Sequence, residues 1–200
     1  MCIRDSLPLV AAVVWLGGFL ATLAGWGIRW RRVAKAMRMA ASIHSGRELD
    51  ALRRIEQAAG LGTSRIDLRI LDGAMEPGIF GVAHPILAWP AGISARLDDA
   101  QLEAILAHEV CHVRRRDNLT AALHMFVQAV FWFHPLVWWV GARLVAERER
   151  ACDEEVLLMC GRPVIYAQSI LKVCEFCVES PLPCVAGVTG ADLKHRVMQI

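Results

Sequence analysis

The chain has 200 residues, of which 56% are hydrophobic, and its mean hydropathy is +0.39. This apolar share is high for a soluble domain and predicts contact with a membrane. The formal net charge at pH 7 is only +2, so we expect no direct binding of nucleic acid.

Seven cysteines are distributed along the chain. Their spacings resemble no small disulfide scaffold, and the chain is long enough to form a core without such crosslinks. We therefore expect reduced thiols in a cytosolic domain. Cys174 and Cys177 form a single CxxC pair on an expected helix face, where packing is the simpler role.

Residues 7–28 contain no charged side chain. As an α-helix they would extend about 33 Å, enough to cross a hydrocarbon core of about 30 Å. The basic residues that follow place the next part of the chain in the cytoplasm by the positive-inside rule. A signal peptide is the alternative, but the apolar run is too long and lacks a small-residue cleavage site. We predict a transmembrane helix at 7–28 and a basic juxtamembrane connector at 29–44.

A small sheet is predicted after this connector. Residues 47–59 have the apolar spacing of a short amphipathic helix. Residues 66–71 alternate between apolar and charged side chains, which predicts a half-buried strand. Two more short strands are expected at 79–82 and 85–89, separated from the first by a Pro-Gly turn.

The next helix carries the sequence HEVCH. Asp98 is a good N-cap, and Gln101 is the matching capping-box residue. His108 and His112 are four residues apart, so both lie on one helical face, as ligands of a shared metal ion must. A zinc ion lowers the pKa of its bound water to about 7. Glu109, rotated about 100° from His108, is placed to accept the proton from that water.

A third ligand is expected from the run ERERACDEEV. A catalytic zinc site usually has three protein ligands and one open position. Glu149 is our candidate, and Asp153, four residues later on the same face, could accept a hydrogen bond from a ligand histidine. Glu147 is the alternative, although it has no aspartate at the same spacing. The competing interpretation is a solvated charged face.

The hydrophobic segment 119–146 separates the two motifs. His134-Pro135 divides it into pieces of about 14 residues, each about 21 Å long, so neither can span a bilayer alone. We predict a helical hairpin that packs in the core or dips into the membrane. Either arrangement returns Glu149 to the side of the membrane on which His112 lies.

The runs PILAWPAGISARLDDAQLEAILAHEVCHVRRRDN and FWFHPLVWWVGARLVAERERACDEEVL resemble the BlaR/MecR-type membrane metallopeptidases, the antirepressor or signal-transducer peptidases of beta-lactam resistance. The resemblance covers roughly residues 45–197 and implies a gluzincin-like domain on the cytoplasmic side of a bacterial plasma (inner) membrane. By position it implies a zinc site with ligands His108, His112 and Glu149, catalytic Glu109 and the acidic residue Asp153.

We therefore predict an α+β, mainly helical fold: a gluzincin-like metallopeptidase domain over 45–200 with a small sheet, after an N-terminal transmembrane helix. The expected function is that of a zinc-dependent, membrane-anchored endopeptidase. Its partners would be the lipid bilayer and a cytoplasmic protein substrate, such as a transcriptional repressor or the peptidase itself. The substrate could bind as a strand added at the sheet edge around 79–89. The opening MCIRDS and the helical pattern near Arg196 suggest a fragment of a longer protein.

Two alternatives stay open. The chain could be a signalling or scaffold protein with a non-catalytic zinc site, although Glu109 is not needed for such a site. It could also be a transporter or channel subunit that holds no stoichiometric zinc. Tyr166, the only tyrosine, is expected to pack on a helix rather than stabilise an oxyanion. His124 is expected to be a buried, hydrogen-bonded histidine.

Overall fold

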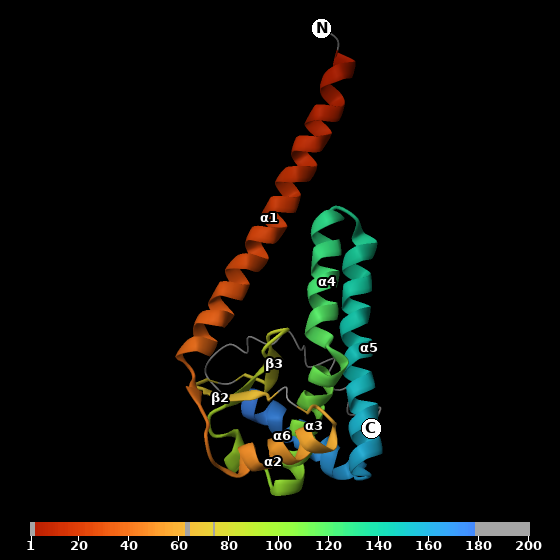
Figure 1. Ribbon diagram of the computed structural model, residues 1–200. Helices are drawn as coiled ribbons and strands as arrows, with labels where there is room; N and C mark the ends of the chain where they lie inside the picture. The colour runs from red at the N-terminus through yellow and green to blue at the C-terminus, as the bar shows by residue number, and fades with distance from the viewer. Residues whose placement is uncertain (1–2, 63–64, 74, 179–200) are drawn as a thin grey trace.

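A computed structural model describes residues 3–62, 65–73 and 75–178. Helices and a small sheet pack into a domain from which a long helix, α1, and a helical hairpin, α4–α5, project in the same direction (Figure 1). The predicted mainly helical α+β fold with a small sheet and an N-terminal apolar helix is confirmed. Residues 179–200 of the expected 45–200 domain, including Arg196, lie outside the described part of the chain.

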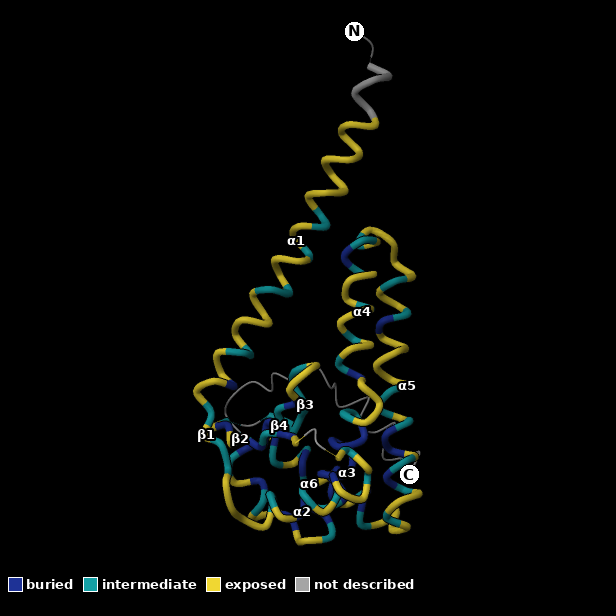
Figure 2. The backbone as a smooth tube through the Cα atoms, in the orientation of Figure 1, coloured by how far each residue is buried: buried dark blue, intermediate teal, exposed yellow. Residues whose placement is uncertain are grey.

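Helix α1 is Ile3–Met39 and continues through most of the basic stretch that we expected to be a connector. Its continuation has a local cause, because residues 29–39 contain no glycine or proline and are rich in the helix formers Arg, Lys, Ala and Met. Among the described residues, this is the one helix long and apolar enough to cross a membrane by length and composition, over Pro8–Met39. Most of its described residues are exposed (Figure 2).

Four short strands form a sheet in the order β1-β2-β4-β3. They are β1 (Ala41–Ser42), β2 (Asp67–Leu71), β3 (Gly78–Phe80) and β4 (Ile86–Pro90). Strand β4 pairs parallel to β2 and antiparallel to β3. The three strands predicted from sequence are each found within two residues of their expected limits. Our expectation of an edge along 79–89 needs correction, because β4 lies inside the sheet and only β3 is at that edge.

Helix α3 (Asp99–Arg115) is the centre of the domain and packs mainly against three other helices. These are α2 (Arg47–Ala58), α5 (Pro135–Cys160) and α6 (Pro163–Val178). A short 3₁₀ helix, η1 (Ile93–Ala95), leads into α3. The core between these elements contains fully buried apolar side chains, among them Leu52, Ile66, Leu68, Leu87, Trp89, Leu102, Leu106 and Val156. The burial of each side chain contributes about 1.5–3 kcal/mol. Leu102 and Leu106 lie on α3, so their burial fixes the rotation of this helix about its axis.

The hydrophobic segment forms a hairpin of α4 (Asp117–Val130) and the first part of α5. The two helices run side by side away from the domain (Figure 1). Many of the hairpin's large apolar side chains face outward, among them Leu119, Leu123, Phe126, Phe131, Phe133, Leu136, Trp138, Trp139, Leu144 and Val145. This exposure is visible along both helices in Figure 2. The hairpin therefore does not pack in the domain core, which was one of our two expectations.

Candidate metal centre

The start of α3 is set by the predicted capping box. The Asp98 carboxylate accepts a hydrogen bond from the backbone N–H of Gln101 at 2.9 Å. The Gln101 side chain in turn accepts one from the backbone N–H of Asp98 at 3.2 Å. With this start fixed and Leu102, Leu106 and Val110 in the core, the remaining face of α3 is turned toward α5.

The structure brings the three expected ligands together. The Nε2 atoms of His108 and His112 lie 3.2 Å apart. Glu149, from α5, places one carboxylate oxygen 3.4 Å from Nε2 of His108 and the other 3.8 Å from Nε2 of His112. Tetrahedral zinc with bonds of 2.0–2.1 Å holds its ligand atoms about 3.3 Å apart. The donor set and its spacing therefore fit zinc. The alternative ligand, Glu147, is exposed and lies outside this group.

The other ring nitrogen of His108 is held by two buried groups. Its Nδ1 atom lies 3.2 Å from Oδ1 of Asp153 and 2.8 Å from the hydroxyl of Tyr166. Tyr166 donates a hydrogen bond to the same Asp153 oxygen at 2.6 Å. Asp153 thus lies beside Nδ1 of His108. Such contacts orient a ligand imidazole and leave its Nε2 lone pair available.

Tyr166 packs on a helix as we expected, and the structure adds a contact that the sequence did not indicate. It is packed in the core, with 1% of its surface exposed, but its hydroxyl reaches the metal group. The helical pattern around it indicated burial and gave no hydrogen-bond partner 58 residues away. A usable signal was present, because a buried tyrosine hydroxyl usually has a partner and the chain has one tyrosine.

His112 has its own carboxylate partner, which sequence reasoning missed. Its Nδ1 atom lies 2.7 Å from Oδ2 of Asp117, the first residue of α4. Burial lowers the pKa of His112, and the neighbouring His108 lowers it further, whereas Glu149 and Asp117 act in the opposite direction. The imidazole is therefore neutral near pH 7, which is the form that binds a metal ion.

A second group of potential ligands shares His112. The Sγ atom of Cys152 lies 3.3 Å from Nδ1 of His112 and 3.8 Å from Oδ2 of Asp117. A thiol binds a metal ion as the thiolate. The pKa of Cys152 is raised, first by its hydrogen bond with Cys111 and then by burial. Because Nε2 of His112 faces His108 and Glu149 while its Nδ1 faces Asp117, we assign Asp117 as the hydrogen-bond partner of His112 rather than as a ligand.

Glu109 follows His108 on α3 and is also buried, with 7% of its surface exposed.

His124 lies within the hairpin, and its Nε2 atom is buried without a hydrogen-bond partner among the described residues. That corrects our expectation of a hydrogen-bonded histidine. The cysteine pair Cys174 and Cys177 lies on α6 at the edge of the core, as packing requires.

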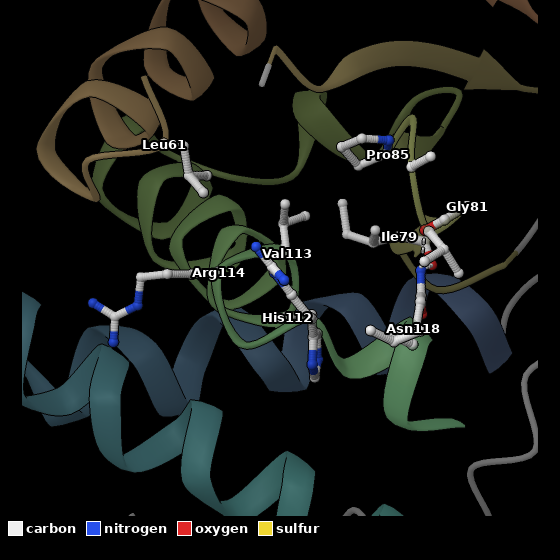
Figure 3. A pocket seen from close by; sticks show the side chains of 12 residues that line it. Leu61, Ile79, Gly81, Pro85, His112, Val113, Arg114 and Asn118 are labelled. Atoms are coloured by element: carbon white, nitrogen blue, oxygen red, sulfur yellow. Dashed lines mark hydrogen bonds between the residues drawn. The ribbon is translucent and has the colours of Figure 1, made fainter. Parts of the chain in front are cut away.

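A cavity of about 380 Å³ lies beside His112, between the end of α3 and the edge strand β3 (Figure 3). Its surface is about equally polar and apolar, and it is lined by Leu61, Ile79, Gly81, Val82, Ala83, Pro85, His112, Val113, Arg114, Arg116, Asn118 and Leu119. The Asn118 side chain donates to the carbonyls of Ile79 and Gly81 at 3.1 and 2.9 Å. It thereby holds β3 next to the metal group.

Two helix-borne histidines, a glutamate between them in sequence and a carboxylate from a second helix define a metallopeptidase-type centre. The chain belongs to the BlaR1 peptidase M56 family, whose profile matches residues 5–200. This family confirms the resemblance seen in the sequence.

Individual relatives cover parts of the chain. Regulatory protein BlaR1 of Bacillus licheniformis is 34% identical over 121 residues, which are 60% of this chain and 20% of that protein. Methicillin resistance mecR1 protein of Staphylococcus aureus strain Mu50 is 29% identical over 98 residues, 48% of this chain and 17% of that protein. A protease HtpX homolog of Nitrosomonas eutropha is 28% identical over 127 residues, which are 60% of this chain and 42% of that protein. The chain thus spans about a fifth of the length of the first two.

Proposed function

We propose that the chain is a zinc-dependent endopeptidase anchored in a bacterial plasma membrane, with its active site facing the cytoplasm. Its substrate would be a cytoplasmic protein, such as a transcriptional repressor, or the peptidase itself. The observation that carries this proposal is the convergence of His108, His112 and Glu149 to within 3.2–3.8 Å, next to buried Glu109. The basic residues after the apolar part of α1 support the cytoplasmic orientation.

The proposed chemistry assigns each side chain one task. When bound, a zinc ion would polarise the scissile carbonyl and acidify a water molecule. Glu109 would accept the proton of the attacking water and deliver it to the leaving amine nitrogen. Asp153 and Tyr166 would keep the Nδ1 proton of His108 in place, and Asp117 would do the same for His112. Both imidazoles then present Nε2 to the metal ion.

The substrate would bind along β3 as an added strand. In an antiparallel strand the backbone N–H and carbonyl of one residue point to the same edge. Asn118 bonds to the carbonyl of Ile79, inside β3, so the N–H of Ile79 also points to the side away from β4. An incoming strand would therefore take over contacts that Asn118 now makes.

Replacing Ile79 with proline removes the outward N–H and should slow cleavage, whereas Ile79→Ala keeps that N–H and should preserve the rate. Equal rates for the two variants would contradict this binding mode.

Glu109→Gln tests the enzymatic proposal against a non-catalytic zinc site. The purified variant and the unchanged chain would be compared for bound zinc and for cleavage of casein and of the chain itself. Zinc retained at one ion per chain with cleavage lost supports the peptidase. Zinc retained with cleavage of neither substrate by the unchanged chain favours a signalling or scaffold role. Absence of stoichiometric zinc from the unchanged chain contradicts both and favours the transporter alternative.

A further inference from the structure

The α4–α5 hairpin has a surface that suits no aqueous setting. From Asn118 to Ala142 the chain contains no Asp, Glu, Lys or Arg. More than half of the surface of Phe126, Phe133 and Trp139 is exposed. A continuous apolar surface of this kind on a soluble protein marks an interaction site. Helix α1, which is long and apolar enough to cross a membrane, has the same character and projects in the same direction (Figures 1 and 2).

The turn at the hairpin tip has unusual hydrogen bonding. Helix α4 ends at Val130, which leaves its carbonyl without a partner in the helix. The indole N–H of Trp15, on α1, donates to that carbonyl at 2.9 Å. The indole N–H of Trp138, on α5, donates to the carbonyl of Trp132 at 2.9 Å. Two tryptophans thus bond to backbone oxygens that water would otherwise reach.

Further hydrogen bonds within the turn are local. The backbone N–H of His134 donates to the carbonyl of Phe131 at 2.9 Å. The His134 ring accepts from the backbone N–H of Leu136 at 3.3 Å, which caps α5. A turn in water needs no such provision, because water pairs with its backbone groups. In hydrocarbon each unpaired group costs several kcal/mol, so non-helical backbone is tolerated there only when protein groups pair with it.

The tip is also attached to α1 at a defined depth. The indole N–H of Trp132 donates to the carbonyl of Trp15 at 3.1 Å. Gly18 makes room for the Trp132 ring, since a Cβ atom there would lie 2.0 Å from a ring carbon. Trp15 and Gly18 lie near the middle of the predicted span 7–28. Ile28 is thirteen residues after Trp15, about 20 Å of helix, and the 14 residues of α4 cover about 21 Å.

We propose that the α4–α5 hairpin is a re-entrant membrane element. It enters the cytoplasmic leaflet, turns near the bilayer centre against α1 and returns to the cytoplasmic side, so that its outward face is covered by lipid acyl chains. This rests on α1 crossing the bilayer, which is part of the proposed function, and does not depend on peptidase activity.

The placement of charge agrees with this topology. Arginines lie at both ends of the uncharged segment, in the run 114–116 before it and at Arg143, Arg148 and Arg150 after it. Side chains of this kind interact with anionic headgroups at the cytoplasmic surface. The Arg143 guanidinium lies over the Trp139 ring, 5.5 Å from its centre, and its long side chain can extend toward the interface. The metal group lies at the base of the hairpin, so the substrate's scissile bond would come close to the membrane surface.

Depth-dependent quenching tests the proposal. A fluorescent non-canonical amino acid replaces Phe133 at the tip or, as a control, Leu158, which is 86% exposed on α5 beyond the metal group. The chain is placed in lipid nanodiscs that carry bromine either near the acyl-chain ends or near the headgroups. We expect the probe at 133 to be quenched most by the deep bromines and at least about fivefold less by aqueous iodide than the probe at 158. Quenching mainly by iodide or by the shallow bromines would overturn the proposal.

A matched pair of glycine variants tests the attachment to α1. Gly18→Leu blocks the seat of Trp132, whereas a Cβ atom at the neighbouring Gly17 meets nothing within 4 Å. We expect Gly18→Leu to shift quenching of the probe at 133 from deep toward shallow bromines and Gly17→Leu to leave it unchanged. The same quenching in both variants would show that α1 does not set the depth of the tip. Zinc content measured on the same samples separates this outcome from a failure of the peptidase proposal.

Discussion

The metal group and the α4–α5 hairpin distribute polarity in opposite ways. In the metal group, charged and polar side chains are buried or half-buried, and both histidines are held by groups from other elements, as Asp153 and Tyr166 hold His108. In the hairpin, apolar side chains are exposed and two backbone carbonyls near the turn accept hydrogen bonds from indoles. The first region therefore depends on its internal partners, whereas the second depends on what surrounds it.

Removing a ligand should break the metal group most severely. We expect His108→Ala to reduce zinc affinity by more than about a hundredfold, beyond the loss that follows removal of a supporting residue. Cleavage should fall below detection. Zinc content after dialysis would measure the effect, with Glu147→Gln as the control because Glu147 is exposed. A His108→Ala variant that keeps its zinc would contradict the ligand assignment.

The hairpin should instead be sensitive to volume between its helices. A Cβ atom at Gly141 would lie 2.6 Å from both Nε2 of His124 and Nε2 of Gln128. We expect Gly141→Leu to destabilise the chain by about 1–3 kcal/mol, as overpacking commonly does. Gly25→Leu is the matched control, because nothing lies within 4 Å of a Cβ atom there. Thermal unfolding followed by circular dichroism in detergent measures both, and equal midpoints would show that the two helices do not pack closely at Gly141.

Tyr166→Phe removes one hydroxyl and little volume, so it tests how far the metal group depends on a single internal partner. We expect zinc affinity to fall by about tenfold, at the low end of the range for groups that orient a ligand. Ser169→Ala is the control, since it deletes a fully buried hydroxyl one turn further along the same helix, away from His108. Incorporation of fluorotyrosine gives a single fluorine resonance, because the chain has one tyrosine. That resonance should shift when zinc is added, and an unchanged resonance would separate Tyr166 from the metal group.

The smallest expected effect concerns pH. The folded chain lowers the pKa of His112 below its usual 6.5, mainly through burial. Below about pH 6.5 the unfolded chain therefore binds more protons at this site, and the stability of the metal-free fold falls as pH decreases. Above that pH the imidazole is neutral in both the folded and the unfolded chain, so it no longer makes stability depend on pH. Urea unfolding at pH 7.5 and 5.5 should show a smaller decrease for His112→Asn than for the unchanged chain. A larger decrease in the variant would contradict a lowered pKa of His112 in the folded chain.

Local sequence signals predicted the framework of the metal group well. The capping box at Asp98 and the spacing of the histidines are properties of one helix, so they could be seen without the fold. The partners of those histidines come from elsewhere. Asp117 begins another helix and Tyr166 lies on α6, and periodicity indicates only that such residues are buried, not what they touch.

The environment of the hairpin was not decided by its sequence for a related reason. A helix face made of Phe, Trp, Leu and Val suits a protein core and a bilayer equally, because both are apolar. The structure excludes the core by exposing that face, and the pairing of the turn with Trp15, a residue more than a hundred positions away, supports our proposal of a bilayer. The continuation of α1 to Met39 was missed because we ended the helix where its hydrophobicity ended, although helix propensity continued.

X-ray absorption at the zinc edge of the zinc-loaded chain tests the central claim most directly. The first coordination shell should contain nitrogen and oxygen at about 2.0–2.2 Å, with two imidazoles and no sulfur. That result corresponds to His108, His112 and Glu149 as the ligands. A sulfur neighbour at about 2.3 Å would place the metal ion with Cys152, Asp117 and the other nitrogen of His112, and would contradict the proposed peptidase centre.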